Sequence, residues 1–125
     1  MSLLQVKKDF EQYFFDNYLE TKVHWAGENF DKDKHKEWVY FEYLGRSVKD
    51  NGYDNTTYEH EGNLYICVIA ETRFRTMEIA DICLELFKGK KIGGAFARQV
   101  MIEGQGMLED SNKSYIDINI QISML

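Results

Sequence analysis

A strict alternation of apolar and polar side chains runs through the C-terminal part of the chain. The apolar positions are Ile116, Ile118, Ile120, Ile122 and Met124, and polar residues fill the positions between them. Side chains along an extended strand point alternately to opposite faces, so this period of two predicts a strand with one buried and one polar face. The chain must therefore build a sheet with a covered face, and other segments must supply the covering layer.

Two amphipathic helices are predicted to form that layer. In residues 3–18 the apolar side chains recur at steps of three and four, which places them on one helix face; they are Leu3, Val6, Phe10, Tyr13 and Phe14. A second helix is expected to begin at an N-cap on Thr76, with Glu78 in its first turn. It should carry an apolar stripe from Ile79 to Phe87 and end in a glycine cap at Gly89.

Runs rich in aromatic and β-branched residues predict the remaining strands, at residues 23–25, 38–44, 64–70 and 97–110. Residues 38–44 and 64–70 are apolar on both faces, so both strands should be well covered and the second should be central. A bulge or bend is expected at Gly104 and Gly106. The order of elements predicts one α+β domain over residues 1–125, a mostly antiparallel (mixed) sheet with two helices packed on one face.

Two segments are predicted to lie outside these elements. Residues 31–36 are charged and should form a solvated loop. Residues 45–57 contain the turn signal Asn51-Gly52, but about a dozen residues separate the flanking strands, so we expect a long, mobile hairpin arm.

The overall charge limits the classes of partner. The net charge of −6 disfavours nonspecific attraction to nucleic acid and to anionic membranes, which are both polyanionic. No apolar run reaches the length needed to span a bilayer, and the N-terminus lacks the apolar segment of a signal peptide. We therefore expect a cytosolic chain with no membrane partner and no sequence-specific nucleic-acid partner.

The residues that could carry chemistry do not form a recognisable motif. His24, His35 and His60 lie apart from any nucleophile motif, and surface histidines are the preferred interpretation. Glu59 and Glu61 share a strand face, where they could act as acid and base or bind a cation, although exposed acids beside a hairpin are commoner. Cys67 and Cys83 are expected to be buried and reduced, and we predict no catalytic residue, metal or cofactor.

Basic side chains gather around the two ends of the second predicted helix, in an otherwise acidic chain; they are Arg73, Arg75, Lys88, Lys90, Lys91 and Arg98. Opposite charges on different sides of one subunit suit head-to-tail association, which closes into a ring when the rotation allows it. Charges that serve only solubility and the helix dipole are an equal alternative.

The order of segments along the chain resembles that of the bacteriophage tail terminator proteins, the family of the lambda-type minor tail protein. The resemblance rests on an N-terminal helix, Thr21-x-Val23-x-Trp25 followed by Asn29-Phe30, and the run WVYFEYL. It continues through EGNLYICVIAE, the helical segment MEIADICLELFKGK and two closing strands with alternating isoleucines. The chain departs from the family in lacking a proline before the first strand and in its long, charged loop.

The resemblance implies a noncatalytic subunit that assembles as a hexameric ring on the tail tube, ends its polymerisation and joins the tail to the head. Its partners would be copies of itself, the tail tube protein and a head-completion protein, in the host cytoplasm during assembly and then in the virion tail. The interface residues expected for this role are Arg73, Arg75, Asn51, Tyr53, Lys90 and Lys91. A small ligand-binding domain and a dimeric adaptor of nonviral function are the alternatives.

Overall fold

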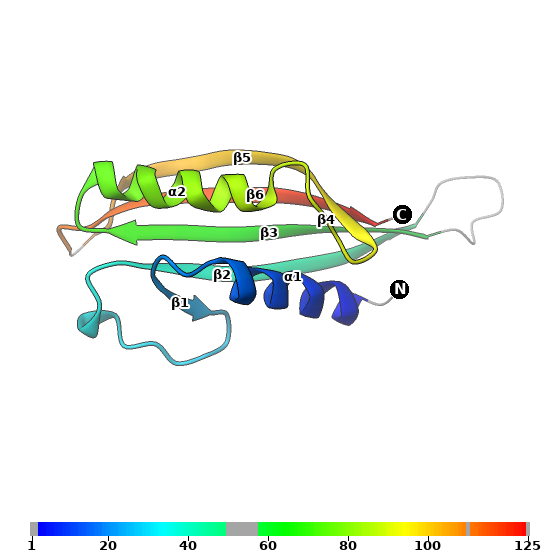
Figure 1. Ribbon diagram of the computed structural model, residues 1–125, viewed down its shortest axis with the longest axis horizontal. Coiled ribbons are helices and arrows are strands. Elements are labelled where there is room, and N and C mark those ends of the chain that lie inside the picture. Colours follow the sequence, from blue (N-terminus) through cyan, green and yellow to red (C-terminus); the bar gives the residue numbers. More distant parts are fainter. Residues whose placement is uncertain (1–2, 50–57, 110, 125) are drawn as a thin grey trace.

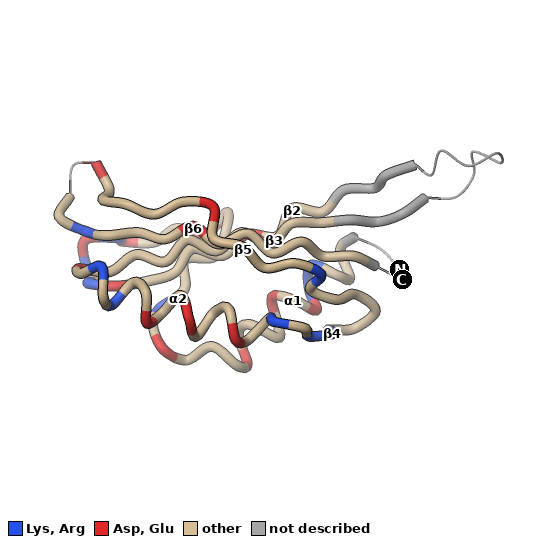
Figure 2. Tube along the Cα trace, turned by 90° about the horizontal axis from the view of Figure 1, so that it is seen from above, with Lys and Arg blue, Asp and Glu red and all other residues tan. Residues whose placement is uncertain are grey.

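The computed structural model describes residues 3–49, 58–109 and 111–124. Its elements are α1 (Leu3–Asn17), β1 (Lys22–Trp25), η1 (Lys32–Lys34), β2 (Trp38–Lys49), β3 (Tyr58–Ala70), α2 (Arg73–Phe87), β4 (Lys91–Ile92), β5 (Ala95–Met107) and β6 (Ser114–Met124). Over these residues the strands form one six-stranded sheet, and both helices lie on the same face of it (Figures 1 and 2). The predicted α+β class is confirmed.

The strand order in the sheet is β1-β2-β3-β6-β5-β4. β1 runs parallel to β2, and every other neighbouring pair is antiparallel. β6 lies between β3 and β5, so the alternating C-terminal segment becomes a central strand. Its four isoleucines are at most 2% exposed, as the alternation predicted.

The hairpin of β2 and β3 is longer than the sequence predicted. The apolar pattern placed the ends of these strands at Leu44 and Leu64, yet their pairing continues to Lys49 opposite Tyr58. Gly45 pairs with Gly62 where the apolar pattern stops. Ladder hydrogen bonds join backbone groups, so pairing can extend beyond the apolar side chains. Residues 45–49 are therefore strand rather than loop, and residues 50–57 of the predicted arm lie outside the described residues.

α2 begins earlier than predicted. Its N-cap is Thr72, whose hydroxyl accepts a hydrogen bond from the Arg75 amide at 3.1 Å. Thr76 is buried inside the first turn, where its hydroxyl donates to the Arg73 carbonyl, so Thr76 is not the cap. Both threonines have the side chain that an N-cap requires, and Thr72 has the extended backbone of a cap. The predicted left-handed glycine at the other end is confirmed, since Gly89 has φ of +66°.

β5 carries the irregularity that its glycines predicted. Its pairing with β6 shifts register between Ile102 and Gly104, and a second shift lies between Ala97 and Gln99. β4 pairs only with Ala95 and Phe96, so most of β5 forms an edge of the described sheet. Within the described ranges, neither helix combines the length and apolar character needed to cross a membrane.

Aromatic rings join the two layers of the fold. The Phe14 ring of α1 lies 4.6 Å from Phe41 of β2 and 5.9 Å from Phe87 of α2, measured between ring centroids. Trp25 of β1 meets Phe14 edge-on at 6.1 Å. Phe14 is fully buried, so one side chain of α1 contacts the sheet and the second helix together. Offset and edge-on ring pairs of this kind add stability beyond the area they bury.

Two buried tyrosines should respond differently to loss of the hydroxyl. The Tyr43 hydroxyl is buried with no hydrogen-bond partner among the described residues, whereas the Tyr18 hydroxyl pairs with Thr21 at 2.7 Å. A buried, unpaired polar group costs about 1–3 kcal/mol, and a paired one contributes about 1 kcal/mol. We expect Tyr43→Phe to leave the free energy of unfolding in urea unchanged or raised, and Tyr18→Phe to lower it. Equal losses in both variants would contradict this account.

Candidate functional site

The predicted interface residues that the structure describes lie in two groups at the ends of α2. Arg73 is exposed at the start of α2, and Lys90 and Lys91 are exposed just beyond its end. A helix rises about 1.5 Å per residue, so the fifteen residues of α2 separate these groups by roughly 22 Å. Figure 2 shows basic residues towards both ends of α2 with acidic residues between them. Asn51 and Tyr53 lie outside the described residues.

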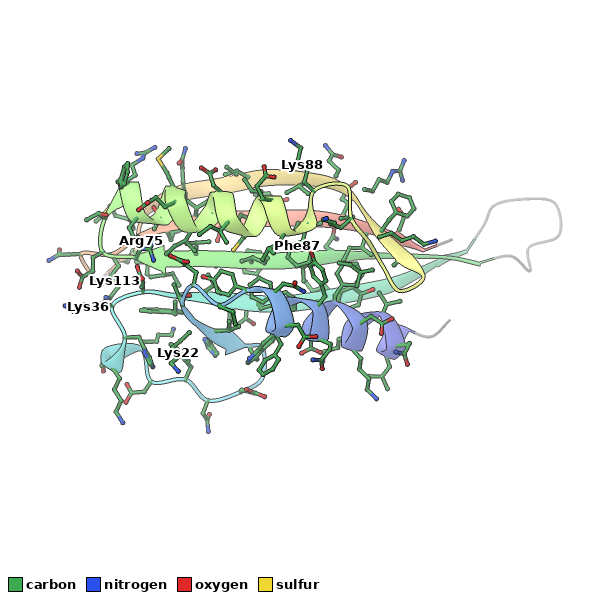
Figure 3. All side chains as sticks on the ribbon, in the orientation of Figure 1. Lys22, Lys36, Arg75, Phe87, Lys88 and Lys113 are labelled. Atoms are coloured by element: carbon green, nitrogen blue, oxygen red, sulfur yellow. The ribbon has the colours of Figure 1, made fainter. Side chains whose placement is uncertain are left out.

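Arg75 is engaged within the subunit. Its guanidinium donates to both carboxylate oxygens of Glu37, at 2.8 and 2.9 Å, and to Glu20 at 2.8 Å. Glu78, one turn further along α2, lies 3.8 Å away. The bidentate pair joins the start of α2 to the residue before β2, and Glu20 adds the segment after α1 (Figure 3). Arg75→Glu would therefore place a fourth carboxylate among three and test the fold as well as any interface.

The Arg75 cluster should contribute to stability in a pH-dependent way. Hydrogen bonds from Arg75 lower the pKa of Glu37 below its ordinary value. A lowered folded-state pKa gives stability that is present above the unfolded-state pKa and lost as the pH falls through the folded-state value. We expect Arg75→Ala to reduce the free energy of unfolding by about 1 kcal/mol at pH 7, since the pair is partly exposed.

The loss should be smaller at pH 3 than at pH 7, because stability linked to the lowered pKa of Glu37 fades as the pH falls below the ordinary value of a glutamate. Arg73→Ala is the matched control: it removes the same charge from an exposed position two residues away and should change stability by under about 0.5 kcal/mol. Urea titrations at both pH values test this. A loss that is the same at pH 3 and pH 7 would show that Arg75 acts through packing instead.

The cysteines are buried and free, as predicted. Burial raises the pKa of each thiol to about 12, and the hydrogen-bonded Asp117 carboxyl contributes to the shift at Cys67. A thiol reacts as its thiolate, so burial and the raised pKa make both cysteines weak nucleophiles at neutral pH. In the described part of the chain, no group of three or more His, Cys, Asp or Glu side chains is placed to hold a metal ion.

Thiol reactivity tests this burial. At pH 8 we expect a disulfide reagent to modify the native protein at least tenfold more slowly than the urea-unfolded protein, because the thiolate fraction falls with the raised pKa. Cys67→Ser and Cys83→Ser identify which thiol accounts for any residual rate. Rapid modification of either cysteine in the native state would contradict the buried, protonated assignment.

The histidines predicted at the surface are half-buried at the two described positions. His24 stacks on Phe30 with ring centroids 5.0 Å apart, and His35 stacks on the same ring at 4.8 Å. Phe30 in turn contacts Trp38 on the face of the sheet away from the helices. These histidines therefore help to pack the segment between β1 and β2. The side chains of Glu59, His60 and Glu61 lie outside the described residues.

Among the described residues, those that cover the sheet face away from the helices lie at one end of it. Trp38, Cys67 and Ile69 form a small buried cluster there. Further along, Tyr65 donates to Asp117 at 2.6 Å and Leu44 is 54% exposed. The prediction that residues 38–44 are covered on both faces thus holds at Trp38 and is wrong at Leu44. The side chains of β2 are buried chiefly on the helix side of the sheet, at Val39, Phe41 and Tyr43.

A hollow of about 540 Å³ lies beside α1 and the end of β1. The aromatic side chains of Phe15 and Trp25 line it, with the carboxylates of Asp9, Glu11 and Glu28. Lys8 is the basic residue among its described lining residues, so the hollow is acidic.

A second hollow, of about 390 Å³, lies between the end of α2 and β5. Leu84, Ala97 and Val100 supply apolar lining, and Lys88 and Arg98 outnumber Glu85. This hollow is therefore basic. Its lining comes from α2 and β5, whereas that of the acidic hollow comes from α1 and the segment around the end of β1.

Phe15 is the feature of these surfaces that the sequence analysis missed. Phe14 and Phe15 are adjacent in a helix, so the two side chains cannot both face the core. Phe14 takes the buried position and Phe15 is 64% exposed. An aromatic residue outside the predicted apolar stripe of α1 was the available signal.

Comparisons with known proteins give a fold and no family. No family model matches the chain, and no curated protein matches its sequence. Among solved structures, a protein whose name states no function matches all of this chain and 96% of its own, with a TM-score of 0.77 and 12% identity. A chain from the virion of a native gene transfer agent (GTA) particle matches 95% of this chain and 93% of its own, with a TM-score of 0.61 and 12% identity. The fold of this chain is therefore similar, over 95% of its length, to that of a chain from a virion particle.

Proposed function

We propose that this chain is a noncatalytic structural subunit of a phage or prophage tail, which forms a ring that caps the tail tube, ends its polymerisation and joins tail to head. The observation that carries the proposal is the fold shared almost end to end with a chain of a phage-like virion particle. The resemblance of the sequence to tail terminator proteins supplies the finer role. Its partners are other copies of itself, the tail tube protein and a head-completion protein.

The surface of the subunit supports assembly more than chemistry. Large apolar side chains are exposed on both helices and just after α1: Phe15 is 64% exposed, Phe74 74% and Leu19 85%. Exposed apolar residues of this size favour a contact surface. Burial raises the pKa of the Cys67 and Cys83 thiols and keeps both protonated. Residues 45–57, which the sequence predicts to be a hairpin arm, are proposed to contact a neighbouring subunit or the tube.

A small ligand-binding domain is the second candidate, and the acidic hollow favours it. Its volume of about 540 Å³ falls in the usual range for ligand sites, about 300–1,000 Å³. Such sites are mostly apolar, whereas three carboxylates line this one. A thermal-shift screen with divalent cations and cationic small molecules tests the candidate, because a ligand of the folded state raises the unfolding temperature.

The proposed function predicts an effect on tube length. The purified protein is added to the polymerising tail tube protein of the same phage or prophage, and tube lengths are measured by electron microscopy. We expect tubes to stop growing when the protein is added, with a ring visible at one end of each tube. Tubes that have already stopped growing when the protein is added should keep their length, which serves as the control. Continued growth with no protein bound at the tube ends would refute the proposal.

A further inference from the structure

The two hollows are complementary in charge. The acidic hollow beside α1 holds three carboxylates and one amine, and the basic hollow beside α2 and β5 holds two cations and one carboxylate. The acidic hollow is bounded by α1 and the end of β1, and the basic hollow by the end of α2 and β5, so one chain carries both. Complementary, non-overlapping surfaces of one subunit produce a head-to-tail contact, in which every copy uses both surfaces.

The charges of both hollows are free to meet an outside partner. Glu28, Lys88 and Arg98 are exposed and Glu11 is half-buried, and none of the four forms an ion pair within the described part of the chain. Arg75 differs, because Glu20 and Glu37 already occupy its guanidinium. Glu11, Glu28, Lys88 and Arg98 are therefore available for a contact, as are other exposed charges of the subunit.

Each hollow also offers apolar surface to a contact. Phe15 and the half-buried Trp25 line the acidic one, and Leu84, Ala97 and Val100 line the basic one. An aromatic side chain that enters an apolar hollow ringed by charge is the usual arrangement at the centre of a protein interface.

Pairing of sheet edges is a less suitable way to join two copies. The β5 edge is interrupted by register shifts on either side of the segment from Gln99 to Ile102. Bulges at sheet edges disrupt the regular ladder that a new strand would need. On the other side, β1 covers β2 from Trp38 to Phe41. Beyond Phe41 this edge of β2 has no strand partner in the described sheet, so the case for the hollows rests on their complementary charge.

We infer that the acidic α1 hollow of one copy binds the basic α2–β5 hollow of the next, with Glu11 and Glu28 facing Lys88 and Arg98 across the contact. The occupant of each hollow is thus a second copy of this chain. The inference rests on the proposed function for the closure of the contact into a ring. The subunit contact then involves Lys88 and Arg98 of one copy, and Phe15 of the other copy adds apolar area.

Charge reversal on each side gives a decisive test. One variant carries Glu11→Lys and Glu28→Lys, and the other carries Lys88→Glu and Arg98→Glu. Each variant alone faces like charges at the contact and should have the mass of a monomer by multi-angle light scattering. An equimolar mixture restores opposite charges at every contact, as does one chain with all four reversals, so both should recover the wild-type mass.

Matched controls carry the same charge changes elsewhere. Asp33→Lys with Glu71→Lys, and Lys22→Glu with Lys36→Glu, alter exposed residues outside both hollows and should keep the wild-type mass. Circular dichroism confirms that each variant is folded. If a double variant does not fold, the single variants Glu11→Lys and Arg98→Glu should still weaken self-association at least tenfold.

The outcomes separate this inference from the proposed function. A wild-type ring whose mass is unchanged in both reversal variants, or a mixture that stays monomeric, overturns the inference and leaves the tail role standing. Charge-dependent association into open filaments that leave tube length unchanged supports the inference and overturns the tail role. A wild-type chain that remains monomeric at a protein concentration of about 100 μM, well above a micromolar dissociation constant, overturns the inference as well.

Discussion

The fold depends most on Phe14, which packs against the sheet and against the second helix. α1 does not follow a sheet crossover, and its position depends on the rings that it shares with β2 and α2. Phe10 extends the same contact, with its ring 6.2 Å from Phe87. Tyr13 adds a hydrogen bond to the Leu86 carbonyl at the end of α2. Because both helices meet through these side chains, the placement of the outer surfaces of α1 depends on the core beneath them.

The sequence pattern predicted the elements that depend on side-chain burial. The isoleucines of β6 and the apolar stripe of α1 follow directly from the side-chain periods of strand and helix, and the structure confirms both. The extension of β2 to Lys49 and the cap at Thr72 were not predicted. Backbone pairing decides the first, and the choice between two equivalent threonines decides the second. Neither is visible in hydrophobic periodicity.

The sequence predicted that the candidate interface would be charged, but it identified only some of the residues that line it. Composition showed basic residues around α2, but it could not distinguish Arg75, which is satisfied by Glu20 and Glu37, from Arg98, which is not. That distinction depends on which distant residues the fold brings to each cation. The acidic hollow likewise joins Glu11 of α1 to Glu28 after β1, two residues that no local pattern connects.

The position of β6 between β3 and β5 has a consequence for synthesis of the protein. β3 is made early, yet one of its edges has no partner until the ribosome has added α2, β4, β5 and then β6. During that interval the nascent chain exposes an apolar strand that is prone to pair with other chains. A protein produced in many copies at once would then gain from chaperones that shield β3 until the sheet is complete.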